Sequence, residues 1–364
     1  MKSTKYFLAP VLGVMACAAH AQSSVTLYGS IDEGFEYVSN VAGHHDYALV
    51  SNTQLLGNRW GIKGKEDLGG GVSAIFQLEN GFSVNNGSAL PNGQMFGRQA
   101  YVGIGSNTLG TVSLGRQYDS IVDYIAPLTA TGAWGGTLFS HPFDADNING
   151  TIRINNSVKY TSVNYAGLQF GGLYGFSNQA GAFASNRTWS IGSRYQNGPL
   201  TVAAAFMNID GAGANGSGAV VSPPYLSAQQ RVGALGATYA VGPALLGLVY
   251  THTDIVSRPT TPPSTLKFDN FEFNAKVNVA SAWYLAAMYT YTSESIAFSG
   301  GHTYPHRNQF GLMADYRLSK RTDLYAQAAY QRASGPNVFA SVGSLTDSSS
   351  RNQAVTRVGI RTSF

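Results

Sequence analysis

Apolar and polar residues alternate one by one along most of this chain. Between residues 24 and 32, Val25, Leu27 and Ile31 fall on one face of an extended segment, and Thr26 and Asp32 fall on the other. This period of two predicts β-strands with one apolar and one polar face. The same pattern recurs to the end of the chain, at 73–79, 152–160, 271–277, 324–331 and 354–364.

About sixteen such segments can be counted, each about ten residues or longer, which is the length that a tilted strand needs to cross a bilayer. Their predicted starts are Ser24, Ser51, Gly71, Met95, Leu109, Thr151, Gly167, Ser185, Pro199, Gln229, Pro243, Leu266, Ala282, His306, Thr322 and Ser350. The sequence therefore predicts an all-β fold, a sixteen-stranded antiparallel transmembrane β-barrel.

The predicted connections alternate between short and long, as in outer-membrane barrels. Short turns fall at 67–70, 106–108, 164–166, 196–198, 240–242, 280–281 and 319–321. Long connections fall near 39–50, 84–94, 118–150, 178–184, 209–228, 254–265, 294–305 and 333–349, and we expect the small-residue-rich stretch 211–224 to be mobile. An even strand number places both ends of the barrel on the short-turn, periplasmic side. A soluble β-sandwich or a secreted adhesin is the alternative fold.

The composition fits a barrel better than a soluble domain. Charged residues make up only 12% of the chain, about half the usual share. Mean hydropathy is −0.07, and no apolar run after residue 21 reaches the roughly 18 residues of a membrane helix. Basic residues are scattered singly, so we expect no nucleic-acid partner.

The N-terminus has the features of an export signal. Lys2 and Lys5 precede an apolar stretch at 6–18, and a small-x-small cleavage site ends at Ala21. We expect residues 1–21 to be a cleaved signal peptide and residues 22–364 to form one barrel domain. The single cysteine, Cys17, lies in this segment, so the mature chain is predicted to contain no disulfide; acylation at Cys17 is the alternative.

Several stretches resemble the general trimeric porins of Gram-negative bacteria, in particular the β-proteobacterial group. They lie at 24–32, 59–69, 74–79, 97–103, 110–118 and 155–160, and the terminal Phe364 completes the resemblance. The resemblance implies a homotrimer of barrels with three separate pores, each narrowed by a third long loop, here 118–150. Enteric porins carry a Pro-Glu-Phe-Gly-Gly-like stretch in this loop, whereas this chain has Ala133-Trp134-Gly135-Gly136 and no Glu.

Alternation and the resemblance together predict a basic side of a pore constriction. Arg59 and Lys63 oppose Trp60 and Ile62, and Arg153 opposes Ile152, so the charged residues are expected to face the lumen. The full predicted basic set is Arg59, Arg98, Arg153, Lys63 and Arg116. Parity alone leaves Arg98 ambiguous, and the resemblance places it inward; Arg116 is expected either to brace the root of the loop or to join the cluster.

Stacked guanidinium groups repel one another, so we expect water and facing carboxylates beside them. The candidates for this acidic side are Glu79, Asp119, Asp123 and Asp32. Such a transverse field orients polar solutes and disfavours apolar ones. Phe364 resembles the residue by which the barrel-assembly machinery recognises its clients, and the six histidines after residue 21 are expected in surface loops or at upper strand ends.

These features predict an outer-membrane general diffusion porin, a water-filled channel for small hydrophilic solutes and ions with a modest anion preference. The expected partners are two further copies of the chain, outer-membrane lipid and lipopolysaccharide, and the barrel-assembly machinery. No cofactor or metal site is predicted. A substrate-specific outer-membrane channel remains the main alternative, and an enzyme barrel is disfavoured because no segment places a nucleophile or paired carboxylates beside a histidine.

Overall fold

The computed structural model describes residues 24–51, 57–258, 263–336, 338–343, 345 and 347–364. The predicted signal peptide, residues 1–21, lies outside the described residues. Among the described residues, none of the helices has the length and apolar character needed to cross a membrane.

One antiparallel sheet contains all the strands that the structure describes. The strands are β1 (Ser24–Val41), β2 (His44–Ser51), β3 (Arg59–Gly69), β4 (Val72–Phe82), β5 (Ala89–Leu90), β6 (Gln99–Ser106), β7 (Gly110–Gln117), β8 (Ile154–Thr161), β9 (Leu168–Gly175), β10 (Arg187–Asn197), β11 (Leu200–Asp210), β12 (Ser227–Val241), β13 (Ala244–Ser257), β14 (Thr265–Asn278), β15 (Trp283–Phe298), β16 (Gly301–Thr303), β17 (His306–Arg317), β18 (Thr322–Ser334) and β19 (Asn352–Ser363).

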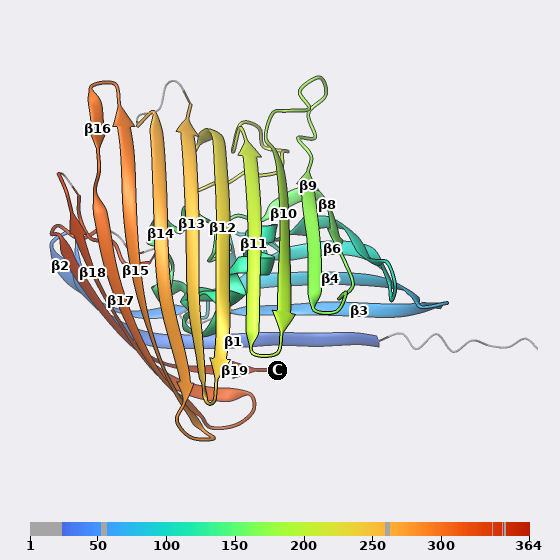
Figure 1. Cartoon of the computed structure of the whole chain (residues 1–364), viewed down its shortest axis with the longest axis horizontal. Coiled ribbons are helices and arrows are strands. Elements are labelled where there is room, and N and C mark those ends of the chain that lie inside the picture. Colours follow the sequence, from blue (N-terminus) through green and yellow to red (C-terminus); the bar gives the residue numbers. More distant parts are fainter. Residues whose placement is uncertain (1–23, 52–56, 259–262, 337, 344, 346) are drawn as a thin grey trace, which may run out of the picture.

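The sheet closes into a barrel (Figure 1), and its nineteen described strands correspond to sixteen barrel strands. β2 and β3 pair with successive parts of β1 and so count as one barrel strand. β5 and β16 are short strands that only extend the pairing beside β4 and β15. β1 pairs with β19 from Ser30 opposite Ser363 to Val38 opposite Val355. Closure pairs the strand edges, which is what a sheet in lipid requires. The predicted sixteen-stranded antiparallel barrel is confirmed.

The first predicted long connection is wrong. Residues 39–50 were expected to form a loop, but β1 runs to Val41 and β2 starts at His44. Ala42 and Gly43 make the turn between them with φ of 50° and 102°. At Gly43 the absence of a Cβ allows this angle without steric cost, so the hairpin turns within two residues.

The outer surface carries the apolar face of the alternation. Val25, Leu27 and Phe35 of β1 are all exposed, and so are Leu248 of β13, Phe271 of β14 and Phe310 of β17, among others. In water such a surface would be unfavourable, whereas in lipid it is not. The outward face is therefore the lipid-contacting face.

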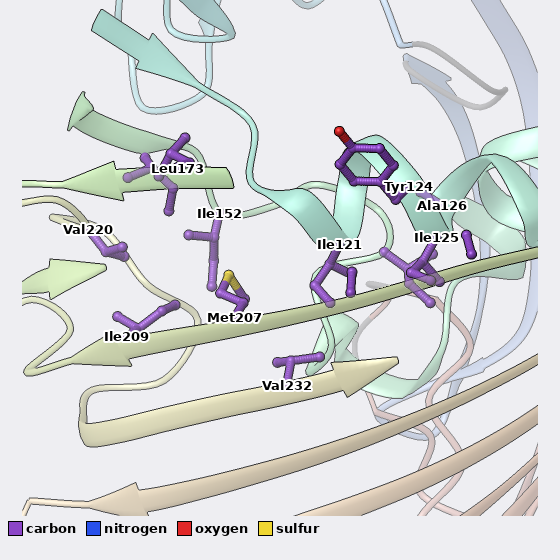
Figure 2. Packing of buried hydrophobic residues seen from close by; sticks show 14 of the residues in the cluster. Ile121, Tyr124, Ile125, Ala126, Ile152, Leu173, Met207, Ile209, Val220 and Val232 are labelled. Atoms are coloured by element: carbon purple, nitrogen blue, oxygen red, sulfur yellow. The ribbon is translucent and has the colours of Figure 1, made fainter. Parts of the chain in front are cut away.

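A long segment between β7 and β8, residues 118–153, folds inside the ring of strands, and we call it the inner loop (Figure 1). It contains the short helical turns η1 (Ile121–Ile125), η2 (Ala126–Leu128), η3 (Thr131–Gly135), η4 (Thr137–Phe139) and η5 (Pro142–Asp144). It packs on inward side chains of the barrel: Figure 2 shows Ile121 and Ile125 beside Met207 and Val232, from β11 and β12. A second apolar cluster joins Trp134 and Phe139 to strands β15–β19.

Ile152 and Ile154 depart from the predicted facing. The alternation placed both on the lipid side, but both are buried in the apolar cluster of the inner loop, in which Figure 2 labels Ile152. Asn156, with φ of 52°, and a register shift between β7 and β8 interrupt the alternation at this point. A β-bulge shifts the alternation by one residue, so the side chains before it and after it follow opposite parities. Ile154, before the bulge, and Lys159, after it, therefore both point inward.

The connection between β11 and β12 also turns inward. Ala212 and Ala219 are fully buried, and Val220 packs in the same cluster as the inner loop. The amide of Asn155 donates to the carbonyl of Ala219 at 2.8 Å. Much of the stretch 211–224 is therefore packed against the barrel mouth, in contrast to the mobile loop expected from its small residues.

Candidate pore constriction

Two predicted arginines share one carboxylate on the barrel wall. Arg98 Nε lies 2.8 Å from Glu79 Oε1, and Arg59 Nη1 lies 3.7 Å from the same oxygen. The Tyr28 hydroxyl donates to Glu79 Oε2 at 2.8 Å. Only 2% of the Glu79 side chain is exposed, so the arginines cover it. Glu79 therefore lies within the basic wall rather than opposite it, and the three groups together keep one positive charge.

Arg98 and Arg116 reach the lumen by breaking the alternation. Arg98 lies in a bend immediately before β6, where its amide donates to the carbonyl of Glu79. Arg116 lies at the register shift between Gly115 and Gln117. Both irregularities release the side chain from the parity of its strand. Parity could not have assigned either residue.

Arg116 and Arg153 lie beside each other with neutral partners. Arg116 Nε donates to the carbonyl of Gly97 at 2.8 Å, and its terminal nitrogen bonds to Asn155 Oδ1. Arg153 donates to the Tyr118 hydroxyl at 3.3 Å and lies over that ring, 5.4 Å from its centre. Within the described part of the chain, neither guanidinium forms a salt bridge. These two charges are therefore not neutralised by contact with a carboxylate.

A cavity of about 600 Å³ lies in front of these side chains. Arg98, Arg116 and Arg153 line it, and the inner loop contributes the neutral polar residues Thr137 and Asn149. Its remaining lining is mostly small, polar or apolar: Gly57, Asn58, Gly81, Leu90, Pro91, Asn92, Gln94, Thr151, Ile152, Val220, Val221, Ser222, Pro223 and Pro224. No Asp or Glu is among the described residues that line this cavity. Its charge is therefore positive.

Asp119 and Asp32, two candidates for the acidic side, are enclosed. Asp119 is fully buried at the root of the inner loop, where it accepts hydrogen bonds from the Ile121 amide at 2.7 Å and from Asn147 Nδ2 at 2.6 Å. Burial raises the pKa of Asp119 to about 6. Asp32 is 1% exposed and accepts a hydrogen bond from the Tyr325 hydroxyl at 2.7 Å. Both carboxylates hold structure in place instead of facing the arginines.

The other two predicted charges are nearer to water. Asp123 of the inner loop pairs with Lys159 of β8, with 30% of the Asp123 side chain exposed. Lys63 of β3 is exposed, and its Nζ lies 5.2 Å from the centre of the Tyr28 ring. Lys63 therefore extends the basic wall along β3, whereas Asp123 is balanced locally.

Phe364 helps to close the seam of the barrel. Its amide and carbonyl exchange hydrogen bonds with Gly29, both at 3.1 Å. A Cβ at residue 29 would meet the Phe364 ring at 2.4 Å, so the ring needs glycine there. Recognition of Phe364 by an assembly machinery remains a prediction.

His141 was expected at the surface, yet it is 1% exposed inside the barrel between Asp146 and Glu272. In the sequence nothing distinguishes it from the loop histidines, because its partner Glu272 comes from β14, far along the chain. No group of three or more His, Cys, Asp and Glu side chains has a metal-binding arrangement in the described ranges.

Comparisons with known proteins are consistent across the chain. The family model described as Gram-negative porin matches residues 8–336. An outer membrane porin protein of Bordetella pertussis is 33% identical over 91% of this chain and 94% of its own length. Outer membrane porin protein 32 of Delftia acidovorans is 30% identical, covering 88% and 87%.

Solved structures share the fold. An anion-selective porin from Comamonas acidovorans superposes with a TM-score of 0.77 at 25% identity, covering 94% of this chain and all of that one. OmpT of Vibrio cholerae in its trimer form reaches a TM-score of 0.67 over 94% of this chain and 99% of that one, at 16% identity, and so supports the fold alone.

Proposed function

This chain belongs to the Gram-negative porin family, and on that premise we propose that it is a general diffusion channel that favours small hydrophilic anions. It lies in the outer membrane of a Gram-negative bacterium as a β-barrel porin. The observation that carries the anion preference is the cavity in front of Arg98, Arg116 and Arg153, since the described residues that line it include no carboxylate.

The charge balance supports this preference. The wall carries four guanidiniums, those of Arg59, Arg98, Arg116 and Arg153, and the carboxylate of Glu79 contacts only the first two of them. A narrow passage between low-dielectric walls focuses the field of such charges and raises the local concentration of counter-ions. The anion-selective porin from Comamonas acidovorans, which has the same fold, is in line with this proposal.

The test is the zero-current potential across a salt gradient with the purified protein in a planar bilayer. We expect the sign of an anion-preferring channel, and a larger preference at 0.01 M salt, where the Debye length is about 30 Å, than at 1 M, where it is about 3 Å. A potential of the opposite sign at low salt would refute the anion preference without affecting the porin fold.

A substrate-specific channel is the second candidate, and the mixed lining of the cavity favours it. Leu90, Pro91 and Val220 offer apolar surface next to Arg98 and Arg153. Such a surface suits an organic anion with an apolar body. A specific channel would show a single-channel current that saturates at modest concentrations of an organic anion, whereas a general pore would not.

We further propose that the chain assembles as a homotrimer. OmpT of Vibrio cholerae, which has the same fold, occurs in a trimer form, and this is in line with the proposal. Unheated protein in mild detergent should sediment and scatter light as a trimer that dissociates on heating. A monomer under these conditions would count against the trimer and leave the barrel unaffected.

Export and insertion complete the proposal. We expect cleavage after Ala21, so mass spectrometry of the membrane form should find Gln22 as the first residue. Lipopolysaccharide is the proposed lipid partner of the outer half of the barrel, and Phe364 is the proposed signal for the barrel-assembly machinery. Deletion of Phe364 should lower the yield of inserted protein far more than deletion of an exposed loop residue such as Gly300.

A further inference from the structure

A histidine joins the inner loop to the barrel wall. His141 Nδ1 lies 2.6 Å from Asp146 Oδ2, also on the inner loop, and His141 Nε2 lies 3.0 Å from Glu272 Oε2 on β14. All three side chains are at most 1% exposed. Both ring nitrogens therefore contact carboxylate oxygens in a site closed to water.

The two carboxylates are held by groups from both the loop and the wall. Glu272 Oε1 accepts hydrogen bonds from the amide of Ala130 and from Asn274 Nδ2, both at 2.7 Å. Asp146 Oδ2 accepts a hydrogen bond from the Thr251 hydroxyl of β13 at 2.6 Å. Residues 130, 141 and 146 of the inner loop are thus tied to β13 and β14.

The charges around the histidine favour its protonated form. Asp144 lies on the same loop, and Tyr225, from the connection after β11, is near Glu294, Asp144 and Asp146. Glu294 of β15 pairs with Arg307 of β17, so that carboxylate is already balanced. Although burial opposes it, contact with Asp146 and Glu272 raises the pKa of His141 to about 10. A neutral ring could donate only one hydrogen bond to the two carboxylates.

We propose that protonated His141 is the positioning residue that fixes the inner loop to β13 and β14 and thereby holds the pore at a constant aperture. Without this cation, two buried carboxylates face each other across the loop–wall contact with no charge between them. Removing one partner of a buried ionic group is strongly unfavourable, because the remaining charges are then buried and uncompensated. The loop should then leave the wall intermittently, and the aperture should fluctuate.

This inference rests on the channel function proposed above, because the readout is ionic current. The experiment compares the full-length protein with His141→Gln, the double variant His141→Gln/Glu272→Gln, and the control His252→Gln in planar bilayers. His252 Nδ1 also contacts a carboxylate, Asp269 at 2.8 Å, but 44% of its side chain is exposed and it lies outside the inner-loop contact.

At pH 7 we expect the open-channel current noise of His141→Gln to rise several-fold over that of the wild type. The double variant should return most of the way, since it removes the repulsion between the carboxylates. His252→Gln should match the wild type. If His141→Gln is as quiet as the wild type, or if the double variant is as noisy as the single one, the cation of His141 does not position the loop.

The pH dependence of the wild-type noise gives a second test, with the double variant as its control. The wild-type noise should rise above pH 10, where His141 loses its proton, while the double variant should show no rise in that range. A rise of equal size in both would assign the effect to other titrating groups and overturn the proposal. The wild-type conductance and reversal potential, measured in the same bilayers, test the channel function separately.

Discussion

The two halves of the barrel have similar outer faces and contrasting inner ones. On β3–β8 the inward side chains include Arg59, Glu79 and Lys159, which are charged. On β9–β18 many are apolar and at most 4% exposed, for example Met207, Val232 and Met288, and charged ones among them such as Glu272 are buried as well. The inner loop covers the second region, which we call the covered half, and leaves the first, which we call the open half, to water.

The difference shows that, within a regular strand, alternation predicts which way a side chain points but not which surroundings it contacts. An apolar residue facing a water-filled lumen would gain nothing, whereas each one covered by a loop contributes roughly 1.5–3 kcal/mol. On β11 both faces are apolar: Ala203, Ala205 and Met207 point inward, and Val202 and Phe206 point outward. A strand that is apolar on both faces therefore marks the wall on which the loop packs.

Removing the charges of the open half should have the largest effect. Replacing Arg59, Arg98 and Arg153 together by Ala leaves Arg116 against a freed Glu79. The anion preference should then disappear, with the permeability ratio shifting about tenfold at low salt, and conductance should rise as the passage widens. Reversal potential and single-channel conductance measure both changes.

The matched control removes three exposed arginines elsewhere, Arg231, Arg332 and Arg351. Their loss should leave both quantities nearly unchanged, because exposed charges away from the passage are screened. Equal effects from the two triple variants would show that Arg59, Arg98 and Arg153 do not determine the ion selectivity of the pore.

The covered half can be broken at its apolar contact. Phe139 is fully buried, packs on Trp134 with ring centres 5.2 Å apart, and fills the space over Gly311 of β17. Phe139→Ala should cost about 3–5 kcal/mol of loop packing, which should widen the pore and make its conductance less uniform. The control is Phe310→Ala, because Phe310 is adjacent to Gly311 but faces the lipid. It should leave conductance unchanged, and a conductance change as large as that of Phe139→Ala would mean that the effect is not specific to the loop contact.

Acid should tighten the covered half. Burial raises the pKa of Asp144 to about 7 in the folded protein, so its contribution to stability is full below its ordinary pKa near 4 and is lost as pH rises through 7. The thermal midpoint in detergent should therefore be a few degrees higher at pH 5 than at pH 8, and Asp144→Asn should reduce that difference. Asp46→Asn, at an exposed site, should preserve it.

The smallest expected effect concerns the far end of the basic wall. Lys63 is exposed, so salt screens its charge more than that of the arginines. Lys63→Gln should lower the anion preference by less than about twofold at low salt and by nothing measurable at 1 M. An effect as large as that of the triple arginine variant would mean that the anion selectivity is determined near Lys63 on β3 and not at the arginines.

The barrel could be predicted from sequence because alternation is a local property of each strand. Alternation could not assign the facing of Arg98 and Arg116, because a bend and a bulge displace them from parity, and only the family resemblance placed Arg98 inward. The burial of His141 depends on Glu272, which only the closed fold brings near. Asp119 turns away from the lumen for a similar reason, since its partner Asn147 lies at the opposite end of the inner loop.

The seam between β1 and β19 has a consequence for how the chain reaches its native state. These are the first and last of the described strands, so the ring cannot close until both are present, and its final contacts have the greatest sequence separation. Such non-local pairing costs loop-closure entropy before any favourable strand contacts form, and this slows folding. Until then each edge strand exposes unpaired amides and carbonyls that could pair with another chain. Escort by a chaperone that masks these edges would suppress such aggregation during transit.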